Sequence, residues 1–160
     1  MIAVSVGPAV DISIHSTLWN GLDCEATIRR AIAAAATPAT AQGEVSVLLT
    51  DDAAIRALNA QWRQRDEATN VLSFPAQQIG AGLPRLLGDI VIAYETTARE
   101  AAAERKRLDH HLAHLTVHGF LHLLGYDHES ETEAETMERL EREILARLDI
   151  ADPYATRDEG

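Results

Sequence analysis

The chain has 160 residues and a formal net charge of −11, with 46% hydrophobic residues and a single cysteine, Cys24. This length is in the range of one domain, and no apolar run approaches the roughly 20 residues that a membrane-spanning helix needs. A lone cysteine excludes an internal disulfide and a thiolate zinc site, and we expect a buried, unreactive thiol. We therefore expect a single domain, residues 1–160. The first residues lack the basic and apolar regions of a secretory signal, so we expect this domain in the cytoplasm.

Hydrophobic residues alternate between a period of two and a period of 3.6 along the chain. The pattern predicts, in order, a strand at 10–14, a helix at 22–36, a loop at 37–43, a strand at 45–49, a helix from about 51 to 63, strands at 71–74 and 89–94, and helices at 95–107, 109–124 and 129–149. Strands interleaved with helices, followed by helices alone, predict an α+β fold: a mixed sheet of about four strands packed with about five helices. The loop from 77 to 84 is expected to be the most mobile element.

The negative charge is concentrated near the end of the chain. Residues 127–160 hold twelve acidic and four basic residues, a net charge of −8, and the rest of the chain carries only −3. Apolar residues recur there at helical spacing, which favours a packed surface helix with a charged solvent face over an acidic interaction surface. The basic residues elsewhere cluster in two places: Arg63 with Arg65, and Arg99 with Arg105, Lys106 and Arg107. This distribution excludes tight nonspecific binding of nucleic acid but allows a weak, salt-sensitive contact with RNA.

The most informative motif is His118-Gly-Phe-Leu-His122-Leu-Leu-Gly125-Tyr-Asp-His128. His118 and His122 are four residues apart, so they share one face of a helix and are displaced by about one turn, ~6 Å. An unbroken helix would point His128 away, but Gly125 can end the helix in the left-handed conformation and let the chain fold His128 back. Three neutral imidazoles favour Zn²⁺, one ion per chain, with a fourth position open for water or substrate; nickel, cobalt and copper are alternatives.

The residue after the first histidine also carries information. Metzincin proteases share this histidine spacing, but they have a glutamate directly after the first histidine as general base. Gly119 occupies that position here, and glycine has no side chain that could accept a proton. The site therefore cannot run the standard zinc-peptidase mechanism with its own carboxylate, which suggests a different hydrolysis.

Three segments, in the same order along the chain, resemble the YbeY endoribonucleases, bacterial metal-dependent RNases of ribosomal RNA maturation. Besides the histidine motif, they are Trp62-Arg63-Gln-Arg65-Asp66 followed by Thr69-Asn70-Val71-Leu72-Ser73-Phe74-Pro75, and then Leu87-Gly88-Asp89-Ile90-Val91-Ile92. Departures from the family pattern are small: Ala68 stands where a proline is common, and Asn70 stands at an often acidic position. Neither departure touches the predicted metal site.

The resemblance implies a zinc-dependent, single-strand-specific endoribonuclease that acts in 16S rRNA 3′-end maturation and in ribosome quality control. Its substrate would be single-stranded or precursor rRNA, brought by the ribosome, by small-subunit ribosomal proteins or by an assembly GTPase. Arg63, which composition alone would class as a solvated charge, matches the functional arginine of the family. A guanidinium can meet two nonbridging phosphate oxygens at once, so Arg63 would join His118, His122 and His128 as a catalytic residue. The nucleophile, water or the neighbouring ribose 2′-hydroxyl, and the general base stay open.

Four side chains near these motifs are candidates to support the site: His114, Asp127, Ser73 and Asn70. His114 shares the face of His118, and we expect it to support the site without binding the metal directly. Asp127 either accepts the second N–H of a ligating imidazole or is an ordinary turn residue. Ser73 and Asn70 either line the same cleft or have a structural role on their strand.

Two other functions are compatible with the sequence. One is a zinc hydrolase of another class, such as a peptidase whose base comes from elsewhere. The other is a noncatalytic ribosome assembly factor in which zinc only staples the helix to the following loop. Structural zinc is usually closed by four protein ligands, so an open three-histidine site favours catalysis. Two further histidines, His110 and His111, lie near the predicted helix start and are expected to be solvated.

Overall fold

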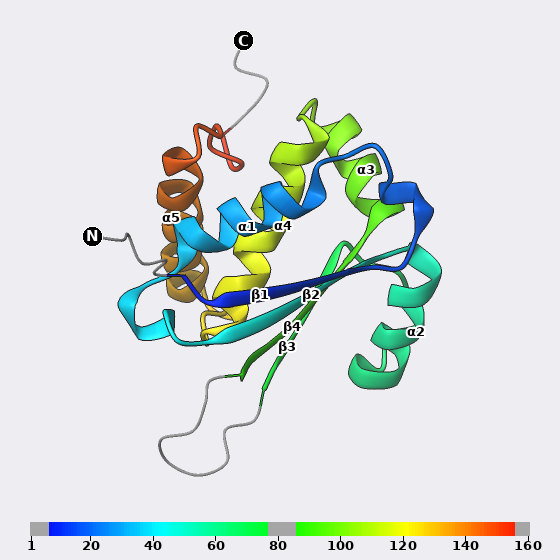
Figure 1. Ribbon diagram of the computed structural model, residues 1–160, viewed down its shortest axis with the longest axis horizontal. Coiled ribbons are helices and arrows are strands. Elements are labelled where there is room, and N and C mark those ends of the chain that lie inside the picture. Colours follow the sequence, from blue (N-terminus) through cyan, green and yellow to red (C-terminus); the bar gives the residue numbers. More distant parts are fainter. Residues whose placement is uncertain (1–6, 77–85, 156–160) are drawn as a thin grey trace, which may run out of the picture.

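A computed structural model describes residues 7–76 and 86–155, in which a four-stranded mixed sheet runs in the order β1-β2-β4-β3 (Figure 1). Strands β1 (Ala9–Ile14), β2 (Glu44–Thr50) and β4 (Leu86–Ala93) are parallel to one another. Strand β3 (Val71–Pro75) pairs antiparallel with β4 and forms one edge of the sheet. The loop predicted at 77–84 lies outside the described residues.

Helices cover both faces of this sheet because successive strand residues point to opposite sides. On one face the buried residues of β2 and β4 pack against α1 (Cys24–Ala35), α4 (Leu108–Leu123) and α5 (Glu131–Arg147). On the other face, α2 (Asp52–Arg63) places Ile55 against Leu72 and Val91. Figure 1 shows α1, α4 and α5 on one side of the sheet and α2 on the other. Helix α3 (Tyr94–Ala103) follows β4 directly and contacts α4.

Local capping explains where the helices nearest the site begin and end. The Asp51 side chain accepts a hydrogen bond from the Ala54 amide at 2.9 Å, which satisfies an otherwise unpaired donor at the start of α2. Ser130 and Glu133 form a capping box at the start of α5. After α4, Gly125 adopts φ +103° and the Tyr126 amide donates to the Leu121 carbonyl at 3.1 Å. This left-handed ending turns the chain back toward α4.

The predicted α+β fold, with four strands and five helices, is confirmed for the described residues. Most predicted boundaries lie within two residues of the observed ones, but the helix predicted at 95–107 ends at Ala103 and β4 begins three residues early, at Leu86. Two short 3-10 helices, Thr17–Trp19 and Pro38–Thr40, were not predicted. Cys24 is 3% exposed and burial raises the pKa of its thiol, as expected for an unreactive cysteine. Among the described residues, no helix combines the length and apolar character needed to cross a membrane.

Candidate metal centre

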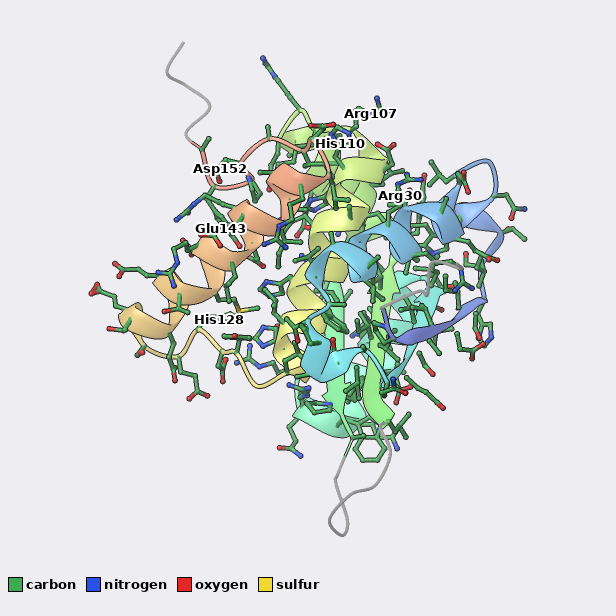
Figure 2. The ribbon with its side chains drawn as sticks, turned by 60° about the vertical axis from the view of Figure 1, so that its left-hand side comes forward. Arg30, Arg107, His110, His128, Glu143 and Asp152 are labelled. Atoms are coloured by element: carbon green, nitrogen blue, oxygen red, sulfur yellow. The ribbon has the colours of Figure 1, made fainter. Side chains whose placement is uncertain are left out.

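The three histidines of the motif meet where α4 ends. Their ring centroids are 4.7 Å apart for His118 and His122, 5.1 Å for His122 and His128, and 5.7 Å for His118 and His128. One nitrogen of each ring lies within 4.8 Å of the other two. Figure 2 shows His128 on the segment that joins α4 to α5. The turn at Gly125 therefore folds His128 back toward the helix, as the motif predicts.

The donor set fits a transition metal that prefers imidazole. Two nitrogens held about 2.05 Å from one tetrahedral ion lie roughly 3.3 Å apart, and the Nε2 atoms of His118 and His122 are 3.2 Å apart. Burial lowers the pKa of His122, and the neighbouring His118 and His128 lower it further. A lowered pKa favours the neutral ring, which is the form that binds metal. Zn²⁺ and other imidazole-binding metals thus fit the residues present.

A buried glutamate lies directly behind His118. Glu141 of α5 is 0% exposed, and its Oε2 lies 2.5 Å from the Nδ1 atom of His118. A carboxylate only accepts, so Nδ1 carries the proton and Nε2 presents its lone pair to the metal position. The hydroxyl of Tyr154 donates to the other carboxylate oxygen. Glu141 thus fixes both the tautomer and the orientation of His118.

The ionisation of this network follows from its hydrogen bonds. Burial opposes ionisation of Glu141, but the neighbouring imidazoles of His114 and His118 outweigh it and lower its pKa to about 2. The Tyr154 pKa is raised by burial and by its hydrogen bond to Glu141. Glu141 is therefore an anion and Tyr154 a neutral donor across the physiological range.

Sequence reasoning missed Glu141 and Tyr154, although a signal for Glu141 was present. Glu141 lies four residues after Met137 and three before Ile144, so it falls within the apolar stripe of the helix and not on its charged face. A carboxylate in that stripe must be buried, and a buried carboxylate requires partners. Tyr154 carries no comparable pattern in the sequence.

Two other histidines of α4, His114 and His111, lie outside the three-histidine cluster. His114 Nε2 is 3.6 Å from Glu141 Oε2 and 3.4 Å from the Tyr154 hydroxyl, so it contacts the supporting network. His114, His118 and Glu141 form a second group close enough to hold an ion, but it shares His118 with the first. The expectation that His111 is solvated is wrong: it is 3% exposed and bonds Glu100 at 2.9 Å. It is buried because α3, which carries Glu100, packs against the start of α4.

Arg63 reaches the same cleft from the end of α2. A cleft of about 590 Å³ is lined by Arg63, by the three clustered histidines and by residues of β3. The Arg63 guanidinium donates to the Ser73 carbonyl at 2.5 Å and lies 5.2 Å from the centre of the Phe74 ring. These contacts hold the positive charge at the edge of the sheet, opposite the imidazoles.

The remaining candidates have identifiable contacts. The Ser73 hydroxyl donates to the Gly119 carbonyl at 2.9 Å, which ties β3 to α4. Asn70 lines the cleft and donates to Glu100 at 2.9 Å. Asp127 accepts from the backbone amide of His128 at 2.8 Å, the contact of a turn residue, while the imidazole contact is made by Glu141.

The glycine after the first histidine faces the sheet. A Cβ at position 119 would lie 2.9 Å from Ile90 Cγ2 and 3.1 Å from the Ser73 hydroxyl. Helix α4 therefore approaches β3 closely at this point, and a longer side chain would meet the sheet at once. A glutamate at position 119 would therefore collide with the sheet.

Fold and site together define an α+β protein with an open three-histidine centre facing an arginine. A family model described as Endoribonuclease YbeY matches residues 13–149. The chain is 56% identical over 163 residues to Endoribonuclease YbeY of Rhodopseudomonas palustris strain BisA53, covering 97% of this chain and 95% of the relative. It is 57% identical over 160 residues to Endoribonuclease YbeY of Nitrobacter winogradskyi, covering 94% and 84%. The chain belongs to the YbeY family.

A solved structure supports the fold independently. The solution structure of TM1509 from Thermotoga maritima superposes with a TM-score of 0.58 and covers 94% of this chain and 98% of that one. The two sequences are 23% identical, so the likeness concerns the fold alone.

Proposed function

We propose that this chain is a zinc-dependent endoribonuclease that cleaves single-stranded RNA in the cleft between Arg63 and the three histidines. The observation that carries the proposal is the shared cleft, which brings together a cation from α2 and three imidazoles from α4 and its following turn. The relatives named endoribonucleases, at more than half identity, support the reaction class.

The three histidines and Arg63 would have different roles in the reaction. His118, His122 and His128 would hold Zn²⁺, which when bound supplies a Lewis acid and lowers the pKa of water. Arg63 uses one N–H on the Ser73 carbonyl and keeps further donors for the nonbridging oxygens of the scissile phosphate. Negative charge grows on those oxygens as the bond breaks, so a fixed guanidinium stabilises the transition state more than the ground state.

Product analysis identifies the nucleophile. A 2′,3′-cyclic phosphate shows that the ribose 2′-hydroxyl attacked, whereas a 3′-hydroxyl with a 5′-phosphate shows that water attacked. Asp127 and Glu129 are carboxylates that line the cleft and are candidates for the general base.

The biological role that we propose follows the family. The substrate would be precursor rRNA, at the 3′ end of 16S rRNA, with a further role in ribosome quality control in the cytoplasm. The chain carries a net charge of −11, which disfavours unaided capture of RNA. We therefore expect the ribosome, a small-subunit protein or an assembly GTPase to deliver the substrate.

The contacts of β3 argue against a peptidase. A peptide substrate commonly adds as a strand to an exposed sheet edge and uses its backbone groups. At the β3 edge, the Ser73 carbonyl already accepts from Arg63, and position 119 offers no base. Chelator-sensitive turnover of casein would nevertheless favour that class over ours.

The test is cleavage of a labelled single-stranded fragment of rRNA by zinc-loaded protein. We expect His122→Ala to abolish cleavage and Arg63→Ala to lower kcat/KM by roughly 10²–10³-fold. Arg65→Ala is the matched control, because Arg65 is an exposed arginine two residues away that pairs with Glu67, and it should cleave normally. Equal cleavage by all four proteins would refute the site. Absence of cleavage, even with ribosomes added, would favour the assembly-factor alternative.

A further inference from the structure

The turn between α3 and α4 holds the only run of three basic residues in the chain, Arg105-Lys106-Arg107. Arg105 adopts φ +57°, and the Lys106 amide donates to the Ala101 carbonyl at 2.9 Å. This is the hydrogen-bonded, left-handed ending of a helix, so the backbone that carries these three charges is held in one conformation. The basic residues line a pocket of about 220 Å³ together with His110 and the segment 150–153.

This basic pocket is connected to the proposed active site. A polar groove of about 430 Å³ shares Lys106 and His114 with the basic pocket, and it shares Asn70 and His118 with the cleft of the three histidines. Figure 2 shows Arg107 and His110 at one end of α4 and His128 near the other. The twelve residues from Lys106 to His118 correspond to about 18 Å along a helix axis, a distance that a few nucleotides can span.

The charges of the basic pocket suit a phosphate. The basic pocket is lined by three cations and by one carboxylate, that of Asp152, in a chain whose net charge is −11. Arg107 pairs with Asp109 at 2.8 Å and Lys106 with Glu104 at 2.7 Å. The Arg107–Asp109 pair lies at the surface, where ion pairs are weak, whereas the Lys106 side chain is only 16% exposed. Arg and Lys each have more N–H donors than one carboxylate uses. A phosphate can therefore share or replace these partners.

The groove between the basic pocket and the cleft of the three histidines suits bases better than phosphates. Glu100 and Glu104 line it and would repel a phosphate backbone. Asn70 and His114 also line it, together with Tyr154, a residue that is 40% exposed. Amide, imidazole and phenol groups can hydrogen-bond or stack with unpaired bases. A strand in this groove would turn its bases inward and its phosphates toward solvent.

We propose that single-stranded RNA, with its scissile phosphate at Arg63, continues along this groove and places a phosphate several nucleotides away in the basic pocket lined by Arg105, Lys106 and Arg107. The inference rests on the proposed function and names the path of the same substrate. It explains how an acidic protein can hold RNA in register: one local basic pocket and one catalytic cleft contact the same strand at two separate points.

The experiment compares binding of two fluorescent 2′-O-methyl RNA oligonucleotides, of about four and about twelve nucleotides, by fluorescence anisotropy. The test variant is Arg105→Gln/Arg107→Gln. The control is Arg30→Gln/Arg139→Gln, which removes two exposed charges outside the groove. All proteins are zinc-loaded and checked for folding by thermal melting, and the probes are checked on gels for integrity.

We expect the test variant to weaken binding of the long probe by about tenfold at low salt and to reduce the magnitude of its salt slope by about 0.7 for each lost contact. Binding of the short probe and cleavage of a short RNA should be unchanged, and the control should match the wild type. An unchanged affinity and salt slope for the long probe would overturn the proposed path. Because binding is measured without cleavage, failure of the nuclease assay and failure of this path are separate results.

Discussion

At the scale of single residues, the site depends on one buried charge. Glu141 is fully buried in α5, yet it accepts hydrogen bonds from His118 and Tyr154 and lies 3.6 Å from His114. A carboxylate in such a position is tolerated because these donors replace the water that it loses. Its negative charge also makes the opposite nitrogen of His118 a better metal ligand.

We predict that Glu141→Gln weakens zinc binding by about 10–100-fold, because the amide carries no charge and can turn a donor toward His118. Glu143→Gln is the matched control, since Glu143 lies on the same helix with its side chain exposed (Figure 2). Competition with a chromophoric zinc chelator measures both affinities, and circular dichroism shows that each variant is folded. Equal zinc affinity in the two variants would mean that Glu141 has only a packing role.

The sequence shows the three clustered histidines of this site more clearly than the residues that contact them from other parts of the chain. His118, His122 and His128 lie within eleven residues, so helix periodicity and one glycine suffice to bring them together. Glu141 and Tyr154 reach His118 only because α5 packs on α4 and the chain then returns, which no local pattern encodes. The burial of His111 depends in the same way on where α3 lies.

At the scale of elements, β3 and the end of α4 pack very closely against β4 at Gly88. This residue of β4 has φ +140°, and a Cβ there would lie 2.4 Å from the Phe74 carbonyl and 2.8 Å from Leu123 Cδ2. Only glycine adopts this conformation without strain and leaves the space that β3 occupies. Since β3 carries the Ser73 carbonyl that holds Arg63, the approach also positions the site.

Gly88→Ala should therefore lower the free energy of unfolding by roughly 2–4 kcal/mol, combining backbone strain with overpacking. Gly21→Ala is the comparison, because Gly21 also has a positive φ, +91°, but a Cβ there meets nothing within 4 Å. It should cost only the conformational strain, about 1–2 kcal/mol. Urea denaturation monitored by circular dichroism gives both values, and an equal loss in the two variants would rule out the close contact as the cause.

Three helix boundaries coincide with residue types that are typical of helix ends. Asp51, Ser130 and Gly125 each stand where a helix begins or ends. The predicted end of α3, at residue 107, lies four residues beyond the observed end at Ala103. The reason is that Arg105, and not a glycine, takes the left-handed conformation there. A basic residue at that position has a conformational cost and no signature in the sequence.

At the scale of the whole molecule, the core and the metal centre are separate. The buried core joins the sheet to α1, α4 and α5 through apolar contacts that include Phe120 and Ile90, each 0% exposed. The centre lies at the end of α4, and its third histidine, His128, is exposed. We therefore expect a metal bound there to add stability through mass action, without being needed to assemble the core.

Removal of zinc by a chelator should leave the far-UV circular dichroism unchanged at 25 °C and lower the Tm by about 5–10 °C. This range corresponds to a stabilisation near 2.7 kcal/mol at a free metal concentration about 100 times Kd, in a domain of this size. Added zinc should restore the Tm, and His122→Ala should melt near the chelated wild type and respond little to chelator. Loss of the folded state on chelation would instead show that the metal staples the helix to the loop, and would favour the noncatalytic assembly factor over the nuclease.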